Sequence, residues 1–113
     1  MTHALPFVAL GGALGASLRY LATLLWPAPS GVLAVNVAGS LAIGILSVRL
    51  APALAPFLVT GVLGGFTTFS AFSLDALRLM EGGRTGPAFL YVGGSVGLSL
   101  LACAAGLWLG RLA

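Results

Sequence analysis

The chain has 113 residues, of which 59% are hydrophobic and only 6% are charged. Soluble domains carry about 25% charged residues, so this composition cannot cover a water-exposed surface. The five basic residues give a formal net charge of +3 but are dispersed along the chain, which argues against a nucleic-acid partner. The composition therefore excludes a soluble domain and predicts an integral membrane protein.

Four apolar segments follow one another along the chain. Each is close to the ~20 residues that a helix needs to cross a bilayer. Residues rich in proline or glycine separate them, and such residues favour turns. The segments span about residues 5–26, 31–48, 57–79 and 87–109. We therefore expect an all-α, multi-pass protein with four transmembrane helices and a single domain over residues 1–113.

Glycine pairs with four-residue spacing occur in the first and fourth segments. Small residues at this spacing allow transmembrane helices to approach one another closely. So many small-residue faces in so short a chain favour an oligomer. The pairs are Gly11/Gly15, Gly93/Gly97 and Gly106/Gly110.

The arginines give no usable orientation signal, although basic residues normally mark cytoplasmic loops. With the N-terminus inside, Arg49 and Arg111 would lie on the inner side, and Arg78 and Arg84 on the outer side. Arg19 lies within the first segment and could snorkel to the interface. Two interpretations stay open. Either a partner fixes the topology, or the chain inserts in both orientations and pairs antiparallel.

The second segment carries one amide side chain, Asn36, about five residues from the start of the segment. A hydrogen bond between helices is one role for such an amide, and these bonds average ~0.6 kcal/mol. Alternatively, the amide offers two N–H donors to an anion. Both roles remain open at this point.

The third segment contains GGFTTFSAFSLD, which begins at Gly64. The adjacent Gly64 and Gly65 weaken helix continuity in the middle of the span. The hydroxyls of Thr67, Thr68 and Ser70 can satisfy the backbone groups that a break releases. Broken helices bind ions in many transport proteins, whereas phenylalanines at this spacing usually pack in a core. The segment is therefore either an ion site or a kinked packing helix.

Groups for proton coupling or catalysis are scarce. Asp75 and Glu81 are the only carboxylates, and both lie near the end of the third segment. Coupled transport usually requires a carboxylate or histidine near the membrane centre, so a passive conduit is favoured over a pump. One histidine, one cysteine and two acids provide no nucleophile–base pair or metal cluster, and we expect no enzyme.

Three sequence blocks together resemble the Fluc (CrcB) family of fluoride channels. They are GGALGASLRY, NVAGSLAIG and GVLGGFTTFSAFS, in the family's order and spacing. The resemblance implies a passive channel in the cell (inner) membrane that exports fluoride and lowers its toxicity. It also implies an antiparallel homodimer of dual topology with a break in the third helix, although some relatives pair with a homologous chain.

The same resemblance assigns residues to two sites. Backbone carbonyls of Gly64 and Thr67, from both subunits, would hold a structural sodium ion that is not transported. The ion pore would be lined by Asn36, Phe69, Phe72 and Ser70. Ala71 stands where similar proteins have a threonine, so one hydroxyl of the family's polar lining is absent.

Two other functions are alternatives. A small four-helix multidrug exporter would need a glutamate in its first helix, and none exists between residues 5 and 26. A non-transporting membrane assembly subunit would need only the glycine faces, and it leaves GGFTTFSAF unexplained.

Overall fold

The structure is a computed structural model that describes residues 2–112, and every regular element in that range is helical. Four spans in this range are long and apolar enough to cross a membrane, which confirms the expected all-α architecture. In chain order the elements are η1 (Thr2–Ala4), α1 (Leu5–Leu25), α2 (Ser30–Arg49), η2 (Pro52–Leu54), the π-helical η3 (Pro56–Leu63), α3 (Gly64–Phe66), α4 (Phe69–Glu81) and α5 (Thr85–Leu112).

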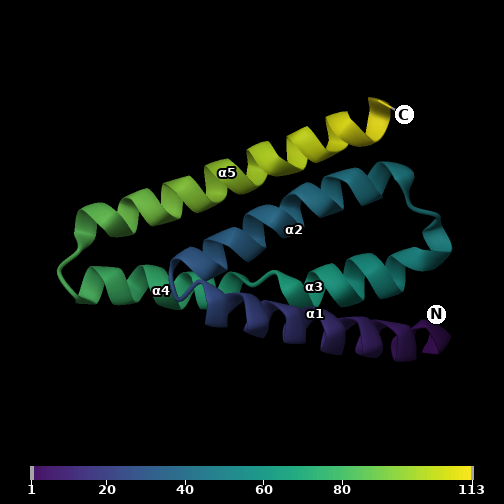
Figure 1. Ribbon diagram of the computed structural model, residues 1–113, viewed down its shortest axis with the longest axis horizontal. Coiled ribbons are helices and arrows are strands. Elements are labelled where there is room, and N and C mark those ends of the chain that lie inside the picture. The colour runs from purple at the N-terminus through teal and green to yellow at the C-terminus, as the bar shows by residue number, and fades with distance from the viewer. Residues whose placement is uncertain (1, 113) are drawn as a thin grey trace.

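The spans run up and down as a layered bundle, and both ends of the chain lie at the same end of it (Figure 1). Helix α2 packs mainly on α5, whereas α1 packs on η3 and α3. The third span, from η2 to the end of α4, crosses the whole length of the bundle (Figure 1). The bundle measures 47 × 32 × 24 Å, and its longest dimension exceeds the ~30 Å of a bilayer's hydrocarbon core.

Glycines bring the backbones together in both helix pairs. A Cβ atom at Gly15 of α1 would lie 2.8 Å from the carbonyl carbon of Val62 and 2.9 Å from the nitrogen of Phe66. In the other pair, a Cβ atom at Gly106 of α5 would lie 3.0 Å from the Cα of Gly44. Lipid tails are as apolar as side chains, so close packing of this kind is a main source of attraction between membrane helices.

Two residues of the third span leave the helical conformation. Thr67 has φ −85° and ψ 156°, and Thr68 has φ −152° and ψ 124°, so both are extended. Gly64 and Gly65 are themselves helical, so the expectation that this pair interrupts the helix was wrong in its position. Gly65 serves packing instead, because a Cβ atom there would lie 3.0 Å from the nitrogen of Ala16 in α1.

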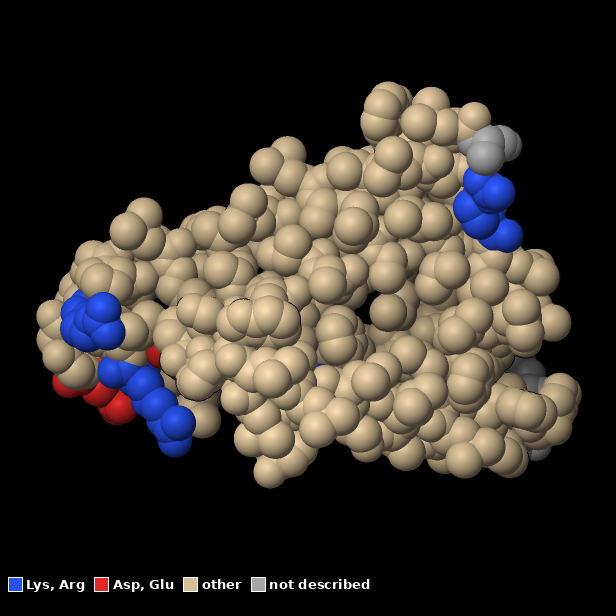
Figure 2. All heavy atoms as spheres, viewed as in Figure 1, with Lys and Arg blue, Asp and Glu red and all other residues tan. Residues whose placement is uncertain are grey.

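Apart from Arg19, which lies within α1, the charged side chains gather toward the two ends of the bundle, with a wide and almost uncharged belt between them on the visible face (Figure 2). Arg78, Glu81 and Arg84 flank the connection between α4 and α5, and Arg49 and Arg111 lie in the last turns of α2 and α5. Each end therefore carries two arginines, and neither has the excess that would mark a cytoplasmic side.

Candidate functional site

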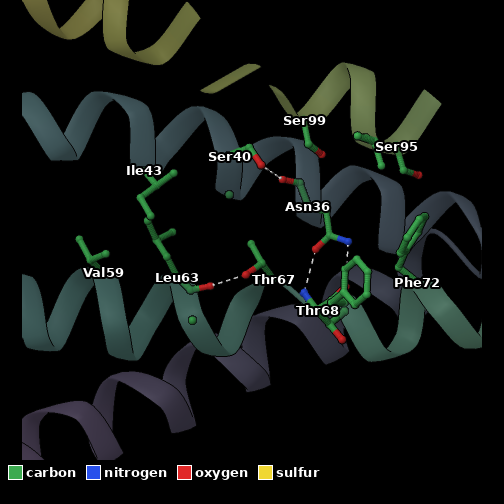
Figure 3. Close-up of a pocket in the computed structure, with 14 residues that line it drawn as sticks. Asn36, Ser40, Ile43, Val59, Leu63, Thr67, Thr68, Phe72, Ser95 and Ser99 are labelled. Carbon is green, nitrogen blue, oxygen red and sulfur yellow. Dashed lines mark hydrogen bonds between the residues drawn. The ribbon is translucent and has the colours of Figure 1, made fainter. Parts of the chain in front are cut away.

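A cavity of about 390 Å³ lies between α2, the extended Thr67–Thr68 pair and α5 (Figure 3). Its lining has no charged side chain, but it includes one amide, five hydroxyls and two phenylalanine rings. These polar and aromatic residues are Asn36, Ser40, Thr67, Thr68, Ser95, Ser99, Phe69 and Phe72. Apolar side chains and glycine backbone form the rest of the lining.

The structure brings most of the sequence-predicted site residues to this cavity. Asn36, Gly64, Thr67, Phe69 and Phe72 all line it. Ser70 does not line it. Its side chain is exposed, and its hydroxyl lies 3.2 Å from the Thr68 hydroxyl, with which it shares a hydrogen bond.

Asn36 links α2 to the extended pair through two hydrogen bonds (Figure 3). Its Nδ2 donates to the carbonyl of Thr68 at 2.9 Å, and the Thr68 N–H donates to its Oδ1 at 2.8 Å. Because a backbone N–H only donates, this pairing fixes which amide atom is oxygen. Asn36 therefore makes an inter-helix hydrogen bond, which is one of the two roles that the sequence left open. This pairing uses one of its two N–H donors.

Thr68 begins α4 as an N-cap residue. Its Oγ1 accepts a hydrogen bond from the backbone N–H of Ala71 at 3.2 Å. Extended backbone angles and a side-chain acceptor of this kind are typical of the position before a helix. Ala71, the position that lacks the family hydroxyl, thus contributes its backbone N–H to the cap, while its methyl group packs against the cluster around Val32, Phe72 and Tyr91.

Two side chains donate hydrogen bonds to carbonyls near the C-terminal end of α3. Thr67 donates both its N–H, at 3.0 Å, and its hydroxyl, at 2.9 Å, to the carbonyl of Leu63. The half-buried Arg19 donates from Nε to the carbonyl of Gly65 at 3.1 Å. A cation at the C-terminal end of a helix is favourable because the last carbonyls lack helical partners. Arg19, whose role the sequence left open, therefore caps α3.

The two predicted pore phenylalanines have different environments. Their ring centroids are 5.4 Å apart and tilted by 52°. Phe72 is 7% exposed and lies 5.3 Å, centroid to centroid, from the Tyr91 ring. Phe69 is 77% exposed. Phe72 thus belongs to the core of the chain, whereas Phe69 projects from its surface.

Sequence reasoning missed the contribution of α5 to the cavity. Ser95 is 5% exposed and its Oγ has no hydrogen-bond partner among the described residues, and Ser99 lies one turn further along the same wall. Tyr91, Ser95 and Ser99 have four-residue spacing, which places three hydroxyls on one face of a helix. That spacing was visible in the sequence, beside the more familiar glycine pairs.

Comparison with known proteins extends over nearly the whole chain. The family model described as CrcB-like protein, Camphor Resistance (CrcB), matches residues 6–107. A relative from Paracoccus denitrificans (strain Pd 1222) is 55% identical over 120 residues, which cover 98% of this chain and 97% of the relative. A relative from Cereibacter sphaeroides (strain ATCC 17029 / ATH 2.4.9) is 57% identical over 116 residues, covering 95% and 94%. One from Rhizobium meliloti (strain 1021) is 52% identical over 124 residues, covering 98% of each. All three relatives are named fluoride-specific ion channel FluC.

Proposed function

The chain belongs to the CrcB family, a family of fluoride ion channels and not of enzymes, and from that premise we propose that it conducts fluoride selectively and passively. It is a multi-pass membrane protein by its four spans. In the proposed role it lies in the inner membrane, lets fluoride leave the cell down its gradient and so lowers fluoride toxicity.

The observation that carries this proposal is the buried hydroxyl of Ser95, which has no hydrogen-bond partner in residues 2–112 and lies in a cavity without charged side chains. A small anion that enters such a cavity must exchange its hydration for hydrogen bonds from the protein. A free hydroxyl donates one such bond, and Ser99 and the second N–H of Asn36 lie along the same lining. Neutral donors bind an anion weakly enough to release it, which conduction requires.

Aromatic edges would complete the ion path. The edge of a phenylalanine ring is electropositive, and both Phe69 and Phe72 line the cavity. Ser70 lies outside the lining in a single subunit, and we assign it to the path only through its contact with the Thr68 hydroxyl. Ser95 and Ser99 join the set that the sequence suggested.

We extend the proposal to an antiparallel dimer, formed with a second copy or with a homologous chain. Gly64 is exposed and lines the cavity, so backbone polar groups would face lipid in an isolated subunit. Such groups must be satisfied by protein within a membrane. The exposed Phe69 ring lies on the same lining, and the balance of arginines between the two ends suits insertion in both orientations.

A structural sodium ion fits the residues at the dimer face. The Thr68 N–H, which would donate to the Gly64 carbonyl in a continuous helix, donates to Asn36 instead. The Ala71 N–H, which would donate to the Thr67 carbonyl, donates to the Thr68 hydroxyl. Both carbonyls thus lack their usual helical donors, and neutral oxygens of this kind suit a hard cation. The ion would offset repulsion between anions and join the two subunits.

Ion efflux from liposomes tests the fluoride proposal. Purified protein is reconstituted in vesicles loaded with potassium fluoride and potassium chloride, valinomycin balances the charge, and ion-selective electrodes follow both anions. We expect rapid release of fluoride with chloride retained. Ser95→Ala should slow the release, while Ser17→Ala, which changes an exposed serine of α1, should not. Release of both anions at equal rates would contradict the selectivity, and no release from folded protein would contradict the channel itself.

A further inference from the structure

The side chains of Asn36 and Thr68 hydrogen-bond to backbone groups at the interruption of the third span. We propose that Asn36 and Thr68 are positioning residues that keep the Gly64 and Thr67 carbonyls available to a cation, by engaging the two N–H groups that would otherwise close the helix over them. This inference rests on the sodium ion of the proposed function.

The first step is the exchange of helical partners. In an α-helix each N–H donates to the carbonyl four residues earlier. Thr68 is four residues after Gly64, and its N–H donates at 2.8 Å to Asn36. Ala71 is four residues after Thr67, and its N–H donates at 3.2 Å to the Thr68 hydroxyl. The Asn36 amide therefore replaces the Gly64 carbonyl as hydrogen-bond acceptor. In the same way, the Thr68 hydroxyl replaces the Thr67 carbonyl.

The second step is the rigidity of the Asn36 amide. Its two hydrogen bonds engage both the N–H and the carbonyl of Thr68, as a neighbouring backbone would. The residue itself sits on α2, which is fixed to α5 about two turns further along by the close approach of Gly44 to Gly106. The extended conformation of Thr68 is thus set by a helix that is distant in sequence and firmly packed.

The third step concerns the carbonyls near the end of α3 that have lost their helical hydrogen-bond donors. The last four carbonyls of a helix lack helical donors, and at the end of α3 the Gly65 carbonyl is engaged by Arg19 at 3.1 Å. Gly64 and Thr67 both line the cavity. Arg19 thus occupies the Gly65 carbonyl, while Asn36 and Thr68 leave the Gly64 and Thr67 carbonyls without their helical donors, and none of these side chains needs to touch the ion.

The consequence is a loss of sodium affinity when either positioning side chain is removed. Without the amide of Asn36, the Thr68 N–H is free to return to the Gly64 carbonyl and lengthen α3. Without the hydroxyl of Thr68, the Ala71 N–H competes for the Thr67 carbonyl. Loss of a residue that orients a metal ligand typically lowers metal affinity by about 10- to 100-fold.

Thermal unfolding of the purified protein in detergent, measured against sodium concentration, tests the inference without relying on transport. N-methyl-D-glucamine replaces sodium to hold the ionic strength. We expect Tm to rise with sodium in the unaltered protein. The midpoint of that rise should move about 10- to 100-fold higher in Asn36→Leu and Thr68→Val. Two controls should keep the midpoint: Thr68→Ser retains the helix cap, and Ser17→Ala removes an exposed hydroxyl of α1 that does not contact Asn36 or Thr68.

A further variant separates positioning from lining of the pore. Asn36→Asp keeps an acceptor for the Thr68 N–H, so its sodium midpoint should not move to higher concentration, while its negative charge should slow fluoride efflux. If Asn36→Leu does not fold, the Thr68→Val and Thr68→Ser pair carries the same test.

The two proposals fail in different ways. An unchanged midpoint in both Asn36→Leu and Thr68→Val, with sodium dependence intact in the unaltered protein, overturns the positioning role. A Tm that does not depend on sodium in the unaltered protein overturns the sodium ion and the positioning role together, and normal fluoride efflux would then still support the channel.

Discussion

Two glycine pairs of α5 have the same spacing and opposite surroundings. Gly106 and Gly110 are buried against α2, and a Cβ atom at Gly106 would lie 3.0 Å from the Cα of Gly44. A Cβ atom at Gly93 or Gly97 would meet nothing within 4 Å. The spacing therefore indicates that a close approach is possible, and a neighbouring helix decides whether it occurs.

The difference identifies the face of α5 that packs against the rest of the chain. Ser95 lies between the two open glycines in sequence, but it faces the cavity and is buried. With 100° between successive helical residues, Gly93 and Gly97 point away from Ser95. One face of α5 thus holds the cavity wall and the α2 contact, whereas the opposite face has open space at Gly93 and Gly97 among the described residues.

The largest effect should come from filling the packed pair. Gly106→Leu would push a side chain into the backbone of α2, and overpacking of this kind costs about 3 kcal/mol or more. We expect almost no monodisperse protein on size-exclusion chromatography. The matched variant Gly97→Leu should give normal yield and normal helix content by circular dichroism. Equal yields from the two variants would contradict the contrast between the faces.

A smaller change sharpens the same contrast. Gly106→Ala adds one methyl group at 3.0 Å from Gly44, and we expect a loss of about 1–3 kcal/mol of unfolding free energy. Gly93→Ala should be neutral or slightly stabilising, because alanine is a better helix former than glycine by about 1 kcal/mol. Thermal unfolding of both variants in the same detergent measures the difference. A lower Tm for Gly93→Ala than for Gly106→Ala would reverse the assignment of the faces.

The smallest effect on stability should come from Ser95, on the buried face. Its Oγ has no partner among the described residues, so Ser95→Ala removes a buried unsatisfied group and should change stability by less than about 1 kcal/mol. The same substitution should nevertheless slow fluoride efflux from liposomes. A large fall in Tm would show that the hydroxyl has a structural partner, which would weaken its place on the ion path.

Much of the fold follows from the sequence alone. Apolar segments of membrane-spanning length and the lack of charge leave helices as the solution, because a helix satisfies its backbone within the segment. Three sequence blocks, in the first, second and third segments, were enough to identify the family and to name five residues that do line one cavity. Composition and motif are local properties, and these conclusions needed nothing else.

The geometry of the site, in contrast, depends on contacts between segments that are distant in sequence. The extended residues are Thr67 and Thr68 and not the preceding glycines, because Asn36, 32 residues away, offers the Thr68 backbone an alternative partner. Ser95 joins the cavity for a similar reason, since α5 must pack beside α2 to bring it there. A sequence specifies which groups need hydrogen bonds, whereas the packing of distant segments determines which groups receive them.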